Sequence, residues 1–124
     1  PGLNSGFMIP QYTAASNVSQ SKQLCTPASV DSIESSNGQE DHVSMGANAA
    51  IHTWQVIQNT QTVLGIECIC ASQALSFREP LQTGTGLRKI LAAFREIVPV
   101  ITHDRYLHPD LVAAGKFVGS FSLS

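Results

Sequence analysis

Charge is scarce in this sequence of 124 residues, and several familiar patterns are absent from it. Charged residues make up 13% of the chain and the net charge is −2, so the composition favours neither a nucleic acid nor an anionic membrane as partner. No apolar run approaches about 18 residues and no basic segment precedes an apolar one, so neither a membrane-spanning helix nor an export signal is expected. A surface with so few charges indicates instead that other protein covers part of it.

Cysteine is also rare. The three cysteines, Cys25, Cys68 and Cys70, are odd in number and no export signal accompanies them, which favours reduced thiols and a cytoplasmic location. Cys68 and Cys70 are two residues apart in an expected helix, where their side chains point about 200° apart and cannot share a metal ion. We therefore interpret them as buried, inert thiols and expect no metal site.

The alternation of apolar and polar residues that is typical of strands is missing, and helical periodicity dominates. Ten positions follow one another in steps of four and three residues, and nine of them are apolar: Val43, Ala47, Ala50, Trp54, Ile57, Gln61, Leu64, Cys68, Ala71 and Leu75. This seam predicts a helix from about residue 41 to 76, roughly 54 Å long. Such a helix requires neighbouring helices, from its own chain or from other subunits, to cover it.

Shorter segments surround the long helix. Residues 3–18 place apolar side chains on one face, although Pro10 is expected to kink a helix there or to restart it. Residues 24–38 are rich in Ser, Pro, Asn and Asp and predict an ordered loop. Residues 83–99 predict another helix, and Pro109 suits the first turn of a last one. The expected fold class is all-α, a bundle built on a long helix.

The most polar stretch of the chain stands directly before the long helix. Residues 36–50, SNGQEDHVSMGANAA, place Glu40, Asp41 and His42 at the end of a glycine-containing loop. A carboxylate in the first turn of a helix stabilises it by a few tenths to about 1 kcal/mol, and capping alone is a sufficient reason for one such residue. The loop carries more polar groups than capping requires. From the residues alone, a helix cap and a functional site are both open interpretations.

Three blocks of sequence connect the chain to a known enzyme family. The blocks are PGLNSGFM (1–8), PASVDSI (27–33) and QEDHVSMGANAA (39–50). In this order and spacing they closely resemble the C-terminal part of the histidine ammonia-lyases, a branch of the aromatic amino acid lyase family, and the resemblance extends to about Pro109. Phenylalanine and tyrosine lyases typically have an Asn-Gln-Asp type of sequence where this chain has Gln39, Glu40 and Asp41. The glutamate therefore resembles the histidine-specific branch.

The resemblance implies a fold, an assembly and a reaction. The family is largely α-helical and forms a homotetramer whose core is a bundle of very long helices, with active sites assembled from three subunits. Its histidine-specific members convert L-histidine to urocanate and ammonia by non-oxidative elimination, in histidine catabolism. Glu40 falls on the active-site glutamate of the family, so the resemblance implies a catalytic role for Glu40 and substrate binding by Gln39 and Glu40. Capping of the long helix is then a secondary role for Asp41.

The cofactor of the family gives a further expectation. Methylidene-imidazolone forms from an Ala-Ser-Gly tripeptide, and the Ala-Ser pairs of this chain are followed by Asn, Val and Gln instead. The resemblance therefore implies that residues 1–124 are a C-terminal helical fragment of such an enzyme and are inactive by themselves. Two alternatives stay open: a non-catalytic helical module that uses the long helix for oligomerisation, and a relative of the phenylalanine or tyrosine lyases.

Overall fold

A computed structural model describes residues 4–120, apart from the side chain of Asp31. The four α-helices of this range are α1 (Met8–Leu24), α2 (Gly46–Ser76), α3 (Thr85–Ile97) and α4 (His108–Ser120), and two short 3-10 turns, Ala28–Asp31 and Ser36–Gly38, lie between α1 and α2. The described residues contain no strand beyond one isolated bridge. The expected all-α class is confirmed.

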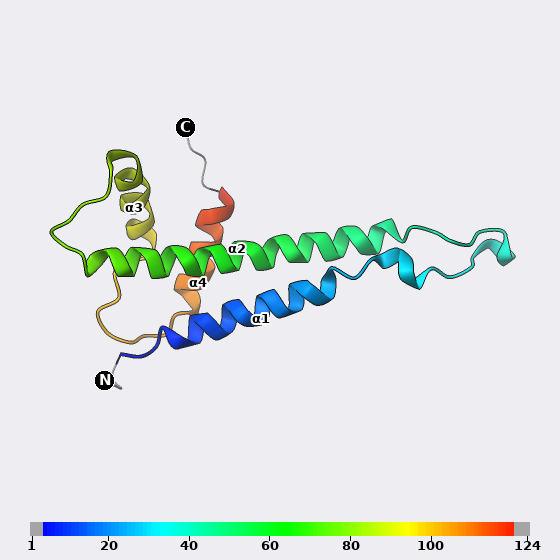
Figure 1. Cartoon of the computed structure of the whole chain (residues 1–124), viewed down its shortest axis with the longest axis horizontal. Coiled ribbons are helices and arrows are strands. Elements are labelled where there is room, and N and C mark those ends of the chain that lie inside the picture. Colours follow the sequence, from blue (N-terminus) through cyan, green and yellow to red (C-terminus); the bar gives the residue numbers. More distant parts are fainter. Residues whose placement is uncertain (1–3, 121–124) are drawn as a thin grey trace.

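The molecule is an elongated helical hairpin with two shorter helices at one end (Figure 1). α1 and α2 lie side by side and antiparallel, and α4 crosses α2 on the side where the chain begins. The connection between α1 and α2 projects from the opposite end of the hairpin, far from α3 and α4. No helix within residues 4–120 combines the length and the apolar character needed to cross a membrane.

The long helix begins later than its sequence predicts. α2 ends at Ser76, as expected, but its first residue is Gly46 rather than a residue near 41, which gives a length of about 46 Å. His42 and Met45 have φ values of 51° and 50°, and a left-handed residue cannot continue a right-handed helix. Met45 occupies the N-cap position and no side chain caps the helix. The expected capping role of Asp41 is therefore wrong, because this residue lies in the loop before the helix.

Pro10 neither kinks nor interrupts α1. The helix begins at Met8, so Pro10 lies in its first turn, where a backbone N–H would have no helical acceptor anyway. The side chain of Pro10 is fully buried. The expectation of a helix disturbed by Pro10 is thus corrected: the helix starts just before the proline, and the proline ring fills space against the rest of the chain.

The hydrophobic core lies at the end of the hairpin that carries α3 and α4. Its buried members are Ile69, Phe94, Val98, Ile101 and Ala114. The ring of Phe94 meets that of Phe117 edge to face, with centroids 5.3 Å apart, which is a favourable aromatic geometry.

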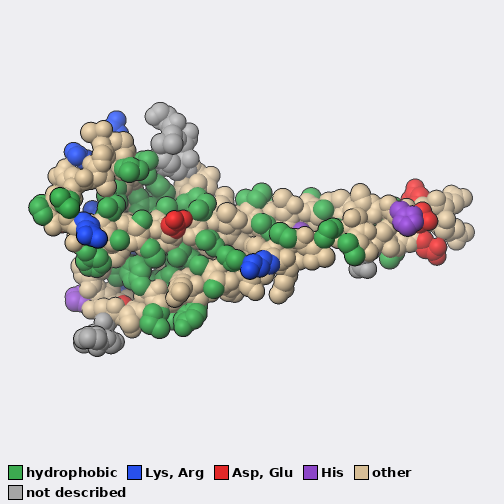
Figure 2. Space-filling view, viewed as in Figure 1, with side chains coloured by type: hydrophobic (Ala, Val, Ile, Leu, Met, Phe, Trp, Pro, Cys, Tyr) green, Lys and Arg blue, Asp and Glu red, His purple; other side chains and the backbone are tan. Residues whose placement is uncertain are grey.

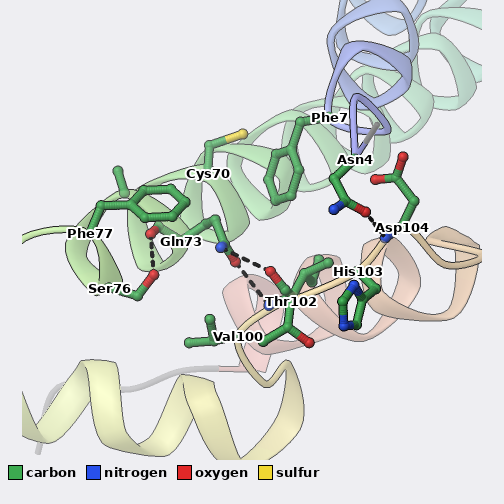
Figure 3. Close-up of a pocket in the computed structure, with 12 residues that line it drawn as sticks. Asn4, Phe7, Cys70, Gln73, Ser76, Phe77, Val100, Thr102, His103 and Asp104 are labelled. Atoms are coloured by element: carbon green, nitrogen blue, oxygen red, sulfur yellow. Dashed lines mark hydrogen bonds between the residues drawn. The ribbon is translucent and has the colours of Figure 1, made fainter. Parts of the chain in front are cut away.

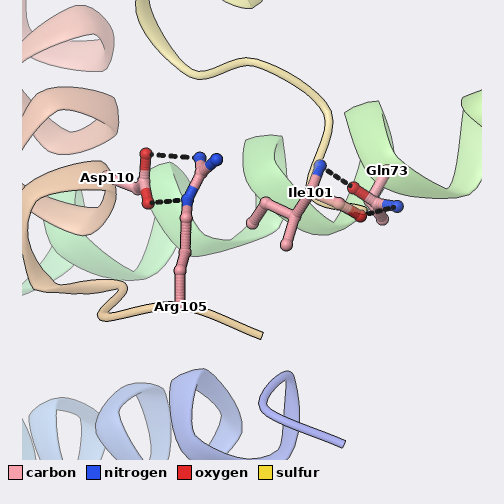
Figure 4. Close-up of polar contacts among 4 residues, drawn as sticks. All are labelled: Gln73, Ile101, Arg105 and Asp110. Atoms are coloured by element: carbon pink, nitrogen blue, oxygen red, sulfur yellow. Dashed lines mark hydrogen bonds and ion pairs between the residues drawn. The ribbon is translucent and has the colours of Figure 1, made fainter. Parts of the chain in front are cut away.

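Gln73 fixes the connection between α3 and α4 on the surface of α2. Its side-chain amide donates to the carbonyl of Ile101 at 3.0 Å, and its carbonyl accepts from the Ile101 N–H at 2.9 Å (Figure 4). Further along this connection, Arg105 donates two hydrogen bonds to the carboxylate of Asp110, at 3.0 and 2.9 Å. The Gln73 bonds place the α3–α4 connection against the C-terminal part of α2, and the Arg105–Asp110 bonds tie this connection to α4.

Most of the apolar seam of α2 faces away from the rest of the chain, although Cys68 packs against the core. Trp54 is 60% exposed, Ile57 49% and Leu64 41%, whereas the face of α2 that packs against α1 and α4 carries Asn59, Ile66 and Ile69. The accessible surface is 9066 Å², against about 6,400 Å² expected for a compact monomer of this mass. The periodicity predicted the helix correctly, but the expected neighbouring helices of the same chain do not cover most of the seam.

A glycine sets the closest approach between α2 and α4, and it generates a test of this packing. A Cβ atom at Gly65 would lie 2.7 Å from the backbone nitrogen of Gly115 and 2.9 Å from the carbonyl carbon of Ala114. A Cβ at Gly115 would have no neighbour closer than 3.8 Å. We expect Gly65→Ala to destabilise the complete protein by about 1–3 kcal/mol, because the crossing must open.

Gly115→Ala is the matched control. It should be neutral or stabilising by up to about 1 kcal/mol, since alanine has the higher helix propensity. Urea unfolding of both variants measures the difference. Equal midpoints for the two variants would contradict the tight crossing at Gly65.

Candidate functional site

The loop that carries Glu40 is closed on itself by a short antiparallel bridge. The N–H of Ser35 donates to the carbonyl of Glu40 at 2.8 Å, and the N–H of Glu40 donates to the carbonyl of Ser35 at 3.2 Å. The 3-10 turn Ser36–Gly38 connects the two sides of the bridge. Glu40 is therefore held by backbone hydrogen bonds at the tip of the hairpin, although no regular element contains it.

Three consecutive residues of this turn have left-handed backbone conformations. The φ values of Ser36, Asn37 and Gly38 are 54°, 63° and 79°. Glycine adopts this region freely and asparagine tolerates it, but for other L-residues it costs about 1–2 kcal/mol. Such outliers persist where the surrounding structure enforces them, and they cluster at functional sites. The turn is therefore an unusual conformation that specific contacts maintain.

The Glu40 carboxylate has one oxygen engaged and the other open. Its Oε2 atom accepts hydrogen bonds from the hydroxyl of Ser35 at 3.3 Å and from the hydroxyl of Ser36 at 3.4 Å. Within the described residues, Oε1 has no hydrogen-bond partner, and the whole side chain is exposed. A carboxylate oxygen held in this way is available to accept a hydrogen bond or a proton from a polar ligand.

The neighbours of Glu40 are exposed as well. Gln39 presents its amide to solvent, next to Glu40 in the sequence and at the same tip. Asp41 and His42 approach each other at 3.9 Å between carboxylate and imidazole, but both are largely exposed, and a pair of this kind contributes little to stability. Figure 2 shows acidic and histidine side chains gathered at this end of the hairpin. The residues singled out in the sequence are therefore brought together on one small loop.

A large groove at the opposite end of the hairpin offers less chemistry. Its volume is about 790 Å³, and its lining comes from Asn4 and Phe7 just before α1, from the end of α2 and from residues 100–104 (Figure 3). Several of the polar groups there already have structural partners: the carboxylate of Asp104 accepts from the Gly6 N–H at 3.0 Å, and the Asp104 N–H donates to the Asn4 side chain at 3.0 Å. The groove thus lies where the residues before α1 pack against the α3–α4 connection.

The cysteines give no sign of a reactive or metal-binding centre. Burial, and then the negative charge of Glu67, raises the pKa of the Cys68 thiol and that of the Cys70 thiol. Both thiols therefore stay protonated at neutral pH, which lowers their reactivity. The expectation that both are buried is wrong, since Cys68 is only partly buried and Cys70 is exposed. Among the described residues, no group of three or more His, Cys, Asp or Glu side chains is placed to hold a metal ion. The loop of Glu40 is the better candidate site.

Comparisons with known proteins identify the family of the chain. A sequence model of the aromatic amino acid lyases matches residues 1–96. The chain belongs to the aromatic amino acid lyase family. Within it, the chain is 56% identical over 117 residues to the histidine ammonia-lyase of Natranaerobius thermophilus, a match that covers 94% of this chain and 23% of that protein. It is 55% identical over 111 residues to the histidine ammonia-lyase of Deinococcus radiodurans, covering 90% and 21%.

Solved structures give the same result for the fold. The crystal structure of histidine ammonia-lyase from Trypanosoma cruzi matches with a TM-score of 0.88 and 39% identity, over 94% of this chain and 23% of that one. An ergothionase from Treponema denticola matches with a TM-score of 0.77 and 28% identity, over 86% and 21%. The resemblance found in the sequence is thereby confirmed. The chain spans less than a quarter of the length of these relatives.

Two residues of the candidate site were not predicted as such. The hydroxyls of Ser35 and Ser36 contact the carboxylate of Glu40, but neither serine was expected at the site from the sequence. The sequence carried one signal for this contact: serines precede a glycine-containing turn, and a carboxylate follows it. The contact depends on the left-handed turn between them, which the sequence does not specify.

The left-handed conformation of Gly38 generates a test of the loop. An added Cβ at Gly38 would have space, with its nearest neighbour 3.5 Å away, but φ at this residue is 79°. We expect Gly38→Ala to destabilise the closed loop by about 1–2 kcal/mol. The hydrogen-exchange protection of the Ser35 and Glu40 amides should then fall by about fivefold to thirtyfold.

Gly46→Ala is the control for this substitution. Its added Cβ also has space, 3.6 Å from the nearest side-chain atom, and its φ is not in the left-handed region. The protection of the same two amides should stay unchanged in this variant. A loss of protection in both variants, or in neither, would contradict a loop held by its left-handed turn.

Proposed function

We propose that this chain is the C-terminal part of a histidine ammonia-lyase, which eliminates ammonia from L-histidine without oxidation and gives urocanate, in histidine catabolism. The observation that carries the proposal is the high identity to histidine ammonia-lyases over nearly the whole chain. The likeness to an ergothionase is weaker in both sequence and structure, so it does not favour a second function. Residues 1–124 contribute one loop of the active site and part of the helical scaffold.

The proposed roles of Gln39 and Glu40 follow from their chemistry. Elimination breaks the bond between the α-carbon and the amino nitrogen and removes a proton from the β-carbon, next to the imidazole ring. The open Oε1 atom of Glu40 is suited to accept a hydrogen bond from an imidazole N–H, and so to bind the substrate and to hold or move a proton there. Gln39 offers an amide donor and an amide acceptor beside it. Glu40 is thus both a substrate-binding and a catalytic residue in this proposal.

The cofactor of the family is outside these residues. The methylidene-imidazolone group supplies the electrophile in the complete enzyme. Because the chain contains no Ala-Ser-Gly, its residues cannot form that group, and the proposal assigns it to another part of the complete protein. Residues 1–124 alone should therefore lack lyase activity.

The exposed face of α2 supports a homo-oligomer, which we propose to be a tetramer built on the long helices. The apolar side chains of Ile51, Trp54, Ile57 and Leu64 are all at least 41% exposed along this one helix. Exposed apolar surface of this extent marks a partner surface. Glu40 and Gln39 lie exposed beyond the end of the same helix, so neighbouring subunits could both cover the seam and complete the site. The three unpaired cysteines support a cytoplasmic location for the assembly.

A charge placed in the exposed face of α2 tests the assembly. We expect Trp54→Glu to raise the dissociation constant of the complete protein by about 100-fold or more, because burying an unpaired carboxylate costs several kcal/mol. Gln23→Glu adds the same charge at an exposed polar position of α1 and should leave association unchanged. Sedimentation equilibrium measures both, with circular dichroism to show retained helix. A Trp54→Glu protein that associates like the wild type would refute the proposed interface.

The role of Glu40 is tested by removing its charge in the complete enzyme. We expect Glu40→Gln to lower kcat for L-histidine by about 100-fold or more, as for the loss of a general acid or base. The melting temperature should change little, since an exposed charge contributes at most about 1 kcal/mol to stability. Urocanate absorbance measures the turnover. Glu34→Gln, the same substitution at another exposed position of this loop, should keep the wild-type rate.

The two interpretations of this loop predict opposite patterns. A purely structural Glu40 would lose thermal stability on substitution while turnover stays near the wild-type value. That combination would exclude the proposed catalytic role.

A further inference from the structure

We infer that Ser35 and Ser36 are positioning residues for the carboxylate of Glu40. They fix one of its oxygens, so that the other is presented to the substrate. The inference rests on the proposed function of Glu40 and extends it from one carboxylate to the three-residue arrangement that orients it. It is carried by the backbone pairing, by the left-handed turn and by the two hydroxyl contacts of the described loop.

The backbone places the side chain of Ser35 next to that of Glu40. Two residues that exchange both of their N–H···O=C bonds are directly opposite each other in an antiparallel pair, and their side chains project on the same side. Ser35 and Glu40 form such a pair, with bonds of 2.8 and 3.2 Å. The hydroxyl of Ser35 therefore reaches Oε2 of Glu40 without any contribution from the rest of the molecule.

Ser36 approaches the same oxygen from the turn. Its φ of 54° is unusual for serine, and this conformation accompanies a hydroxyl contact with Oε2 of Glu40 at 3.4 Å. Two donors on one oxygen restrict rotation of a side chain that would otherwise move freely in solvent. Both contacts are longer than the usual hydroxyl–carboxylate range, so each is weak by itself and the two act together on Oε2.

The consequence for the reaction is a matter of geometry. A catalytic group displaced by about 1 Å can lose about 100-fold in rate, because the reacting atoms are no longer aligned. Loss of one hydroxyl leaves the other in place, so each single substitution should have a smaller effect than the double one. We expect Ser35→Ala and Ser36→Ala each to lower kcat/KM by about threefold to tenfold, and the double variant by about thirtyfold.

The experiment measures kcat and KM of the complete enzyme for L-histidine in these three variants and two companions. Ser35→Thr keeps a hydroxyl on an extended backbone, with φ of −139°, and should restore most of the activity lost in Ser35→Ala. Ser36→Gly removes the hydroxyl and also relieves the left-handed strain, so it should lose as much activity as Ser36→Ala while the loop gains stability. If strain rather than the hydroxyl mattered, the glycine variant would be as active as the wild type, which would overturn the inference.

A second set of variants separates positioning from general damage to the loop. In a Glu40→Ala background no carboxylate remains to be positioned, so Ser35→Ala and Ser36→Ala should change the residual rate by less than about twofold. Equal losses in both backgrounds would show a structural role and overturn the inference. If the serine variants keep the wild-type kcat/KM while Glu40→Gln inactivates the enzyme, the positioning role is refuted and the proposed role of Glu40 is not. If Glu40→Gln is itself silent, the proposed role of Glu40 fails and this inference fails with it.

Discussion

The rest of the structure depends on the register between α1 and α2, and one buried amide sets that register. Asn59 is only 4% exposed; its amide donates to the side chain of Gln20 at 2.9 Å and to that of Ser21 at 3.2 Å, and its carbonyl accepts from Gln55 at 3.1 Å. A slip of one helical turn would take Gln20 and Ser21 away from this buried amide and leave its N–H donors unpaired, at a cost of about 1–3 kcal/mol. The two ends of the loop that carries Glu40 are therefore held at a fixed separation.

The hydrophobic core and the candidate site lie at opposite ends of this scaffold. The core around Phe94 and Ile69 lies where α3 and α4 meet α2, whereas Glu40 lies beyond the first residue of α2. The core end is closed by apolar packing and by the paired hydrogen bonds of Gln73. The tip is closed by its own backbone bridge and little else. This division leaves the tip open to whatever completes the proposed active site.

The sequence predicts the helices of this chain better than it predicts which surfaces they pack against. Periodicity predicted α2 because apolar side chains recur every three or four residues on any helix face that is covered. The same pattern arises whether the covering surface is α1 or another subunit, so the sequence could not distinguish the two. The predicted start of the helix was wrong because His42 and Met45 adopt left-handed conformations, which cannot be predicted from their residue types. Glu40 was recognised through the residues around it, and its role stays a prediction. The hydroxyl contacts of Ser35 and Ser36 could not be predicted, since they exist only in the folded turn.

The crossing at Gly65 is also a point about which α2 can rotate relative to α4. From Gly65 to Gly46 the helix extends for about 28 Å, so a rotation of one degree about the crossing moves its first residue by about 0.5 Å. That displacement is about the whole tolerance within which a catalytic group must be held. The close approach to α4, however tight, is too far from the loop to aim Glu40 by itself. Angular stiffness must come from contacts near the first turns of the helix. Residues 24–28 already adjoin it there, and the exposed side chains of Ile51 and Trp54 lie where a neighbouring helix would add support.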